Sequence, residues 1–95
     1  MTWLNTNLEQ LRRIVSEVSG VDIFQKSRRR EIVVPRWLFF HFAKRLGYQL
    51  TEISEFSGFH HSSIIHGLNN LGLVHVRKEL RRHIMVRLRQ LRYVR

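Results

Sequence analysis

The residues best equipped for chemistry lie between Gly58 and Leu68, in the segment GFHHSSIIHGL. Its three histidines and two serines are side chains that bind metal ions, act as nucleophile and base, or hydrogen-bond to a ligand. A metal site from His60, His61 and His66 is disfavoured, because adjacent helical residues point about 100° apart and no carboxylate lies within a turn. A Ser–His dyad here lacks an acid to orient its base. We therefore expect no metal site, no catalytic site and no cofactor.

The same polar residues stand where a helix begins after a tight turn. Apolar residues repeat at helical spacing on both sides of Gly58, and the predicted inner faces are Leu50, Ile53 and Phe56 before the turn, and Ile64, Ile65, Leu68 and Leu71 after it. Two helices joined by a short glycine-containing turn form a helix-turn-helix unit, whose second helix enters the major groove of DNA with its first turn. Side chains there meet base edges, and free backbone N–H groups favour phosphate. His60, His61, Ser62 and Ser63 are thus predicted DNA contacts, whereas His66 also suits packing or hydrogen bonding on the helix flank.

The remaining segments are also predicted to be helical, which gives an all-α fold in a single domain over residues 1–95. A first helix follows the capping residue Asn7 and ends at Gly20. Pro35 is expected to open the next helix, which ends at Gly47. We expect this helix to be the most buried, because the large apolar residues 37–40 face all sides of it.

Charge points to a polyanionic partner. The net charge is +10 and the pI about 11.6, and the whole excess lies in residues 27–95. Two blocks carry most of it: the run SRRR at 27–30, and the last 24 residues, where eight Lys/Arg oppose only Glu79. The second block belongs to a predicted amphipathic helix after Gly72. That helix suits several roles: packing on the domain, flanking a DNA backbone, binding RNA or anionic lipid, or self-association through Leu80, Ile84, Leu88 and Leu91.

The amino-acid composition limits which covalent cross-links and which cellular compartment are expected. There is no cysteine, so disulfides and thiolate sites are excluded. No apolar run reaches the 18 or so residues of a membrane span, and the first residues do not have the pattern of a signal peptide. We expect a cytoplasmic protein, for which a membrane partner is disfavoured.

From Asn7 to about Leu71, the chain resembles the C-terminal DNA-binding domain (domain IV) of the bacterial replication initiator DnaA. The matching features are a basic loop, an R-x-x-x-x-PR helix entry, an L-x-E-I helix and a GRDH-[ST]-T-[VI]-x-H signature; their counterparts are Arg28–Arg30, Pro35 with Arg36, Leu50–Ile53 and Gly58–His66. The resemblance implies that one loop arginine enters the minor groove and that His61, Ser62 and Ser63 meet bases or phosphates in the major groove. It also implies a bacterial or phage protein at the nucleoid. The candidate DNA-binding residues are Arg28, Arg29, Arg30, Pro35, Arg36, Phe59, His60, His61, Ser62, Ser63 and His66.

Two departures from the family pattern limit what the resemblance implies. Phe59 and His60 replace the arginine and aspartate of GRDH, which removes a cation and an acceptor suited to base edges, so a different or looser sequence preference is expected. No GxxxxGK[ST] phosphate loop is present, so we expect a regulator of replication or transcription without ATPase or other enzyme activity. Its expected partners are double-stranded DNA and, as further options, a DnaA-type initiator or a second copy, with no small-molecule substrate. The alternatives are a charge-driven RNA or anionic-membrane binder, or an interaction protein that kept the fold and lost specific reading.

Overall fold

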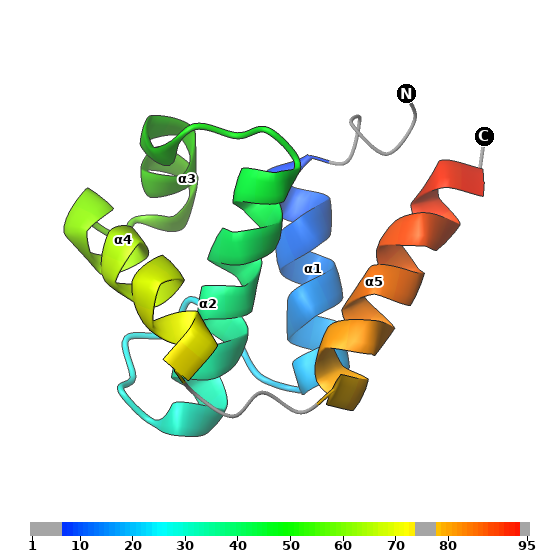
Figure 1. Cartoon of the computed structure of the whole chain (residues 1–95), viewed down its shortest axis with the longest axis horizontal. Helices are drawn as coiled ribbons and strands as arrows, with labels where there is room; N and C mark the ends of the chain where they lie inside the picture. Colours follow the sequence, from blue (N-terminus) through cyan, green and yellow to red (C-terminus); the bar gives the residue numbers. More distant parts are fainter. Residues whose placement is uncertain (1–6, 74–77, 94–95) are drawn as a thin grey trace.

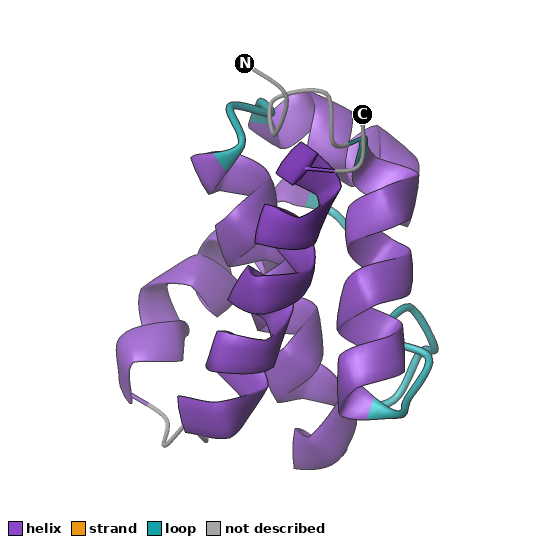
Figure 2. Ribbon diagram, turned by 90° about the vertical axis from the view of Figure 1, so that its right-hand side faces the viewer, coloured by secondary structure: helices purple, strands orange, loops and turns teal. Residues whose placement is uncertain are grey.

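The computed structural model describes residues 7–73 and 78–93, and these residues form helices and loops without a strand (Figures 1 and 2). The elements in chain order are α1 (Leu8–Ser19), α2 (Arg30–Arg45), α3 (Leu50–Ser57), α4 (His61–Asn70), the short 3₁₀ helix η2 (Leu71–Leu73) and α5 (Lys78–Tyr93). The predicted all-α fold is therefore confirmed. No helix in the described ranges is long and apolar enough to cross a membrane.

α1 begins and ends where its sequence signals lie. The Asn7 side chain accepts a hydrogen bond from Gln10 N at 2.8 Å, and Asn7 N donates to Gln10 Oε1 at 3.0 Å, which makes a reciprocal cap. Gly20 ends the helix in the left-handed region with φ 78°.

α2 is the central helix, as predicted, but it does not begin at Pro35. It begins at Arg30, with Arg29 as the residue before its first turn, so Pro35 lies inside the helix and is buried. A proline there removes one helical hydrogen bond. The added turn is still favourable, because it buries Ile32 and Val34 in the interior.

The core lies around α2 and links every helix to it or to α1. α1 and α4 both pack against α2, α3 packs against α2 and α4, and α5 packs against α1. The largest fully buried side chains of α2 are Leu38, Phe39 and Phe40. Viewed along the short axis of the molecule, α4 and α5 therefore lie at opposite ends, with α2 and α1 between them (Figure 1).

The inner face of α4 differs from the predicted one. Ile64 is fully buried, whereas Ile65 is 43% exposed. Because α4 spans only 10 residues and contacts its neighbours along one narrow face, only one of two adjacent isoleucines reaches the interior. Phe56 of α3 was also predicted to face inward and is 37% exposed, although its ring still stacks on Phe39.

α5 uses its apolar stripe for packing within the domain. Ile84 is fully buried, and Leu80 and Leu88 are half-buried against the same core. Arg87 Nη2 donates to Glu17 Oε1 of α1 at 2.6 Å. Gly72 belongs to η2 and α5 is described from Lys78 on, so the segment between them, where the helix was predicted to start, lies outside the described residues. The side chains of the predicted apolar positions 73, 76 and 91 also lie outside the described part of the chain.

Candidate nucleic-acid interface

The turn between α3 and α4 is fixed by the hydroxyl groups of two serines, one as a hydrogen-bond donor and one as an acceptor. Gly58 adopts φ 78°, a left-handed conformation that glycine takes without strain. Ser54 Oγ donates to Phe59 O at 2.7 Å, and Phe59 N donates to Ser57 Oγ at 3.2 Å. Sequence reasoning missed this role of Ser54 and Ser57, although serine in and beside a glycine turn is a signal for it.

His60 caps α4 instead of belonging to its first turn. Its Nδ1 accepts a hydrogen bond from Ser62 N at 3.1 Å and lies 2.9 Å from Ser62 Oγ. Because Nδ1 accepts from a backbone N–H, the neutral ring carries its proton on Nε2. His60 therefore offers a hydrogen-bond donor at Nε2, in a residue that is exposed.

The start of α4 is open to solvent, as the predicted contacts require. His60, His61, Ser62 and Ser63 are all exposed. Ser62 N and Ser63 N are already bonded to His60, so these two backbone donors are not free for phosphate. The surface at the start of this helix is thus formed mainly by side chains.

The basic loop, which here means residues 21–29 between α1 and α2, is held in place by Arg36, which is 8% exposed. Its Nε donates to Ile23 O at 2.7 Å, and its Nη2 donates to Ser27 O at 3.1 Å and to Gln25 O. Burial lowers the pKa of the Arg36 guanidinium. Pro35 is buried, and the Arg36 guanidinium is used mainly inside the domain, where it fixes the course of residues 23–27.

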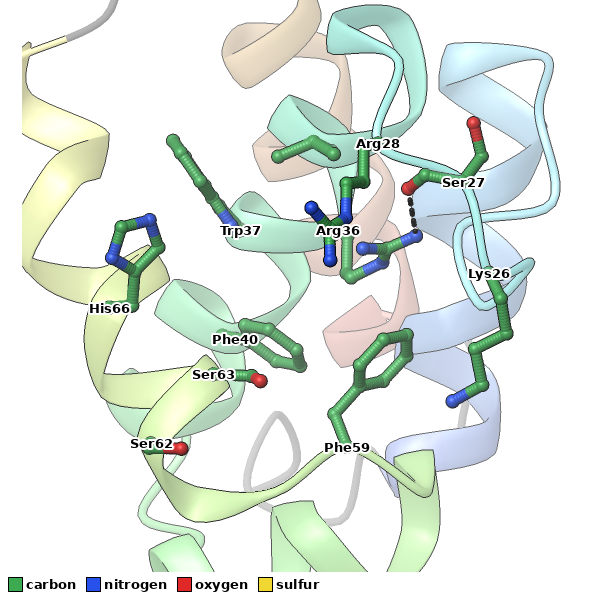
Figure 3. A pocket seen from close by; sticks show the side chains of 11 residues that line it. Lys26, Ser27, Arg28, Arg36, Trp37, Phe40, Phe59, Ser62, Ser63 and His66 are labelled. Carbon is green, nitrogen blue, oxygen red and sulfur yellow. Dashed lines mark hydrogen bonds between the residues drawn. The ribbon is translucent and has the colours of Figure 1, made fainter.

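A groove joins the basic loop to α4. It has a volume of about 890 Å³, and its lining residues come from the loop, α2 and α4: Lys26, Ser27, Arg28, Val33, Arg36, Trp37, Phe40, Phe59, Ser62, Ser63 and His66 (Figure 3). Trp37, Phe40 and Phe59 give it aromatic walls, while Lys26 and Arg28 supply cations on the loop side and the two serines supply hydroxyls on the other. Of the three consecutive loop arginines, Arg28 alone is among these lining residues.

Arg29 and Arg30 lie where the loop becomes α2. Arg29 precedes the first turn, and its Nη1 lies 4.0 Å from Glu31 Oε1 in an exposed ion pair. Arg30 is the first residue of the helix. Both side chains are exposed.

His66 sits at one end of the groove and makes contacts on the flank of α4. Its ring lies edge-on to Trp37, with 5.7 Å between the ring centroids. Asn70 Nδ2 donates to His66 O at 2.7 Å and lies 3.3 Å from its Nδ1. These contacts fit the packing role that the sequence left open.

Within the described ranges, no three His, Cys, Asp or Glu side chains cluster as a metal site would require.

The segment that carries the exposed second helix, the glycine turn and the basic loop matches a known protein family. The family described as the bacterial dnaA protein helix-turn-helix matches residues 9–71. The chain belongs to this family. Searches of curated proteins and of solved structures gave no match. The resemblance seen in the sequence is confirmed, and the DnaA helix-turn-helix is a DNA-binding domain.

Phe59, which stands where the DnaA pattern has arginine, is part of the link between turn and loop. Lys26 Nζ lies 3.9 Å from its ring centroid and Arg36 Cζ lies 4.5 Å from it. Its ring also contacts Phe24 and Phe40 at centroid distances of 6.2 and 6.1 Å. Cations over an aromatic face are attracted by its quadrupole. Phe59 therefore attaches the turn to the basic loop, in a half-buried site.

Proposed function

We propose that this domain binds double-stranded DNA with the start of α4 in the major groove and with Arg28 of the basic loop on the adjacent minor groove or backbone. The observation that supports this most is the shared groove, in which the loop cation and the α4 hydroxyls line one surface. Helix-turn-helix domains read base edges with this part of the second helix, and basic arms reach neighbouring grooves. Family membership supports the same reading.

Sequence preference is proposed to come from His60, His61, Ser62 and Ser63. All four are exposed at the start of α4. His60 presents Nε2–H as a donor in the place where the family signature has an aspartate acceptor. A donor pairs with the acceptors of guanine, adenine or thymine and not with the cytosine amino group. We therefore infer a target site that differs from the usual site of the initiator.

The biological role we infer is regulation of replication or transcription by DNA binding alone. No GxxxxGK[ST] phosphate loop occurs in these 95 residues, so ATP hydrolysis is not part of the proposed activity. Under this proposal, a DnaA-type initiator bound at neighbouring sites is a partner.

The test is selection of bound duplexes from a random pool, followed by binding measurements with variants. Ser62→Ala with Ser63→Ala should weaken the selected duplex by about 1–3 kcal/mol per lost base contact and leave random duplex nearly unchanged. Arg28→Gln should weaken both duplexes and lower the salt slope by about 0.9 if it contacts one phosphate.

Ser16→Ala is the matched control, because Ser16 lies on α1, across α2 from α4, and its hydroxyl has no hydrogen-bond partner among the described residues. The proposal is wrong if no duplex is selected, or if the serine variants bind the selected duplex as the unchanged protein does. Preferential binding of RNA or of anionic vesicles in parallel assays would favour the charge-driven alternatives.

A further inference from the structure

α5 carries a second cationic surface, which lies after the residues that match the DnaA family. The match ends at residue 71, and α5 begins at Lys78. Lys78, Arg82 and Arg89 follow one another at steps of four and seven residues, so they share one face of the helix. All three are exposed, and none forms an ion pair within the described ranges.

This face points away from the rest of the molecule. Ile84, which is fully buried, defines the inner side of α5, and Arg82 lies two residues before it, about 200° around the helix. Arg87 is different, because its guanidinium is bound to Glu17 of α1. The row from Lys78 to Arg89 is about 16 Å long, roughly half a helical turn of duplex DNA.

A duplex bound at the start of α4 cannot reach this row. α4 packs on α2, α2 on α1, and α1 on α5, so α4 and α5 lie on opposite sides of a molecule whose longest extent is 37 Å (Figure 1). The outer face of α5 points away from α4. A polyanion bound to the outer face of α5 is therefore a different molecule, or a different segment, from the duplex bound at the start of α4.

The packing of α5 argues against two other occupants. A helix that binds at a membrane surface must place a free apolar face among the lipids, and self-association through a leucine stripe also requires that stripe to be free. Here Ile84 is buried, and Leu80 and Leu88 pack against the domain core. What the outer face offers is a row of cations, which complements a phosphate backbone.

We infer that the outer face of α5 binds the backbone of a second DNA duplex, so that one protein chain bridges two duplex segments. This inference rests on the proposed function, since the first duplex is the one bound by α4. The contact is with phosphates and is independent of sequence. Bridging by a monomer follows from the opposite placement of the two surfaces.

The test is a two-duplex capture assay with the full chain. A biotin-labelled duplex that carries the selected site is fixed to beads, and a fluorescent duplex of random sequence is free in solution. The unchanged protein should hold the fluorescent duplex on the beads. Arg82→Gln with Arg89→Gln should still bind the fixed duplex but capture about tenfold less of the free one, with a salt slope of capture smaller by about 1.8.

Arg13→Gln with Lys44→Gln is the matched control, because it removes the same charge from exposed positions on α1 and α2 and should leave capture unchanged. Ser62→Ala with Ser63→Ala and Arg28→Gln should weaken binding to the fixed duplex and reduce capture in proportion. The mass of the bridged complex, from light scattering, should correspond to one chain between two duplexes.

The outcomes separate this inference from the proposed function. Binding of the fixed duplex without capture, capture that the α5 variant does not reduce, or a complex with two chains overturns the bridging inference alone. Capture of RNA or of anionic vesicles in place of duplex overturns the assignment of DNA to α5. Failure to bind the fixed duplex overturns the proposed function itself.

Discussion

Ile65 is an apolar side chain that α4 leaves in solvent, with 43% of its surface exposed. It follows His61 by four residues and Ser62 by three, so it lies on the same face of the helix as these two proposed contacts. The major groove presents one apolar group, the thymine methyl, to such a side chain. At the residue scale, Ile65 is thus the natural candidate to read thymine next to the polar contacts.

Ile65→Ala should weaken the selected duplex by about 1–2 kcal/mol, since each methyl or methylene removed from water contributes about 0.8 kcal/mol. Replacing the contacted thymine by uracil, which lacks the methyl, should weaken binding of the unchanged protein and have no further effect on the variant. Titration of each protein with each duplex measures this coupling. Val86→Ala, which truncates a side chain of similar exposure on α5, is the control. Equal uracil effects in the unchanged protein and in Ile65→Ala would contradict the assignment.

Arg36 gives a second prediction at this scale, because it binds three backbone carbonyls from within the domain. Arg36→Met should lower the free energy of unfolding by at least about 2 kcal/mol, since buried acceptors lose a charged donor. Binding to selected and random duplexes should weaken together, because the loop that carries Arg28 loses its attachment. Urea unfolding and duplex titration measure the two effects. Arg13→Met, at an exposed position of α1, should change neither.

Some of these residue roles were predictable and some were not. The Asn7 cap and the glycines that end α1 and α3 follow from local backbone chemistry, which a sequence displays directly. Arg36 was expected at the DNA surface. Its burial could not be predicted from local sequence, because it depends on residues 23–27 folding back over it. Ile64 and Ile65 could not be distinguished, since helical periodicity does not separate two adjacent apolar residues.

At the element scale, α4 approaches α2 closely because Gly67 has no side chain. A Cβ added at Gly67 would lie 2.4 Å from Trp37 Cδ1 and 2.8 Å from Trp37 Nε1. Alanine is favoured over glycine within a helix by about 1 kcal/mol, whereas overpacking costs about 1–3 kcal/mol. The two effects oppose each other at this position, and the contact with Trp37 decides which is larger.

Gly67→Ala should therefore destabilise the domain, but stabilise it by up to about 1 kcal/mol when Trp37 is first replaced by alanine. The change of sign is the diagnostic result, because only the clash depends on Trp37. A double-mutant cycle in urea unfolding measures it. If Gly67→Ala has the same effect in both backgrounds, the α2–α4 contact does not have the geometry described.

The half-buried His41 of α2 should make stability depend on pH. Burial lowers the pKa of His41 on α2 below its usual 6.5, and the positive charges of Arg81 on α5 and Arg45 on α2 lower it further. Between the lowered pKa and 6.5, the unfolded chain binds more protons than the folded one, so acid favours unfolding. Stability from the neutral His41 is complete above pH 6.5 and is lost as the pH falls from 6.5 through the lowered pKa of the folded state.

His41→Gln should accordingly flatten the dependence of the unfolding free energy on pH below about 6.5. Urea unfolding of both proteins at a series of pH values, without DNA, gives the difference between their free energies of unfolding. The contributions of the other histidines are the same in both proteins and cancel in this difference. The explanation fails if the two proteins lose stability in parallel as the pH falls.

At the scale of the whole molecule, the sequence predicted the two cationic blocks but not their relation in space. The blocks at residues 27–30 and 72–95 were visible as composition. The opposite placement of α4 and of the described helix α5 follows from the order in which α4, α2, α1 and α5 pack, and each of those contacts depends on tertiary burial. The same packing argues against two of the roles left open for the last helix, lipid binding and self-association, since Ile84, Leu80 and Leu88 are used inside the domain.

α5 lies beyond the residues that match the DnaA family, yet it is part of the same core. Ile84→Ala should lower the free energy of unfolding by about 2–4 kcal/mol, a large share of the 5–15 kcal/mol typical of a domain. Val86→Ala, two residues away on the exposed side, should change it by less than about 0.5 kcal/mol. Urea unfolding of the two variants gives the comparison. If they unfold at the same urea concentration, α5 does not pack on α1 as described, and the opposite placement of the two cationic surfaces loses its basis.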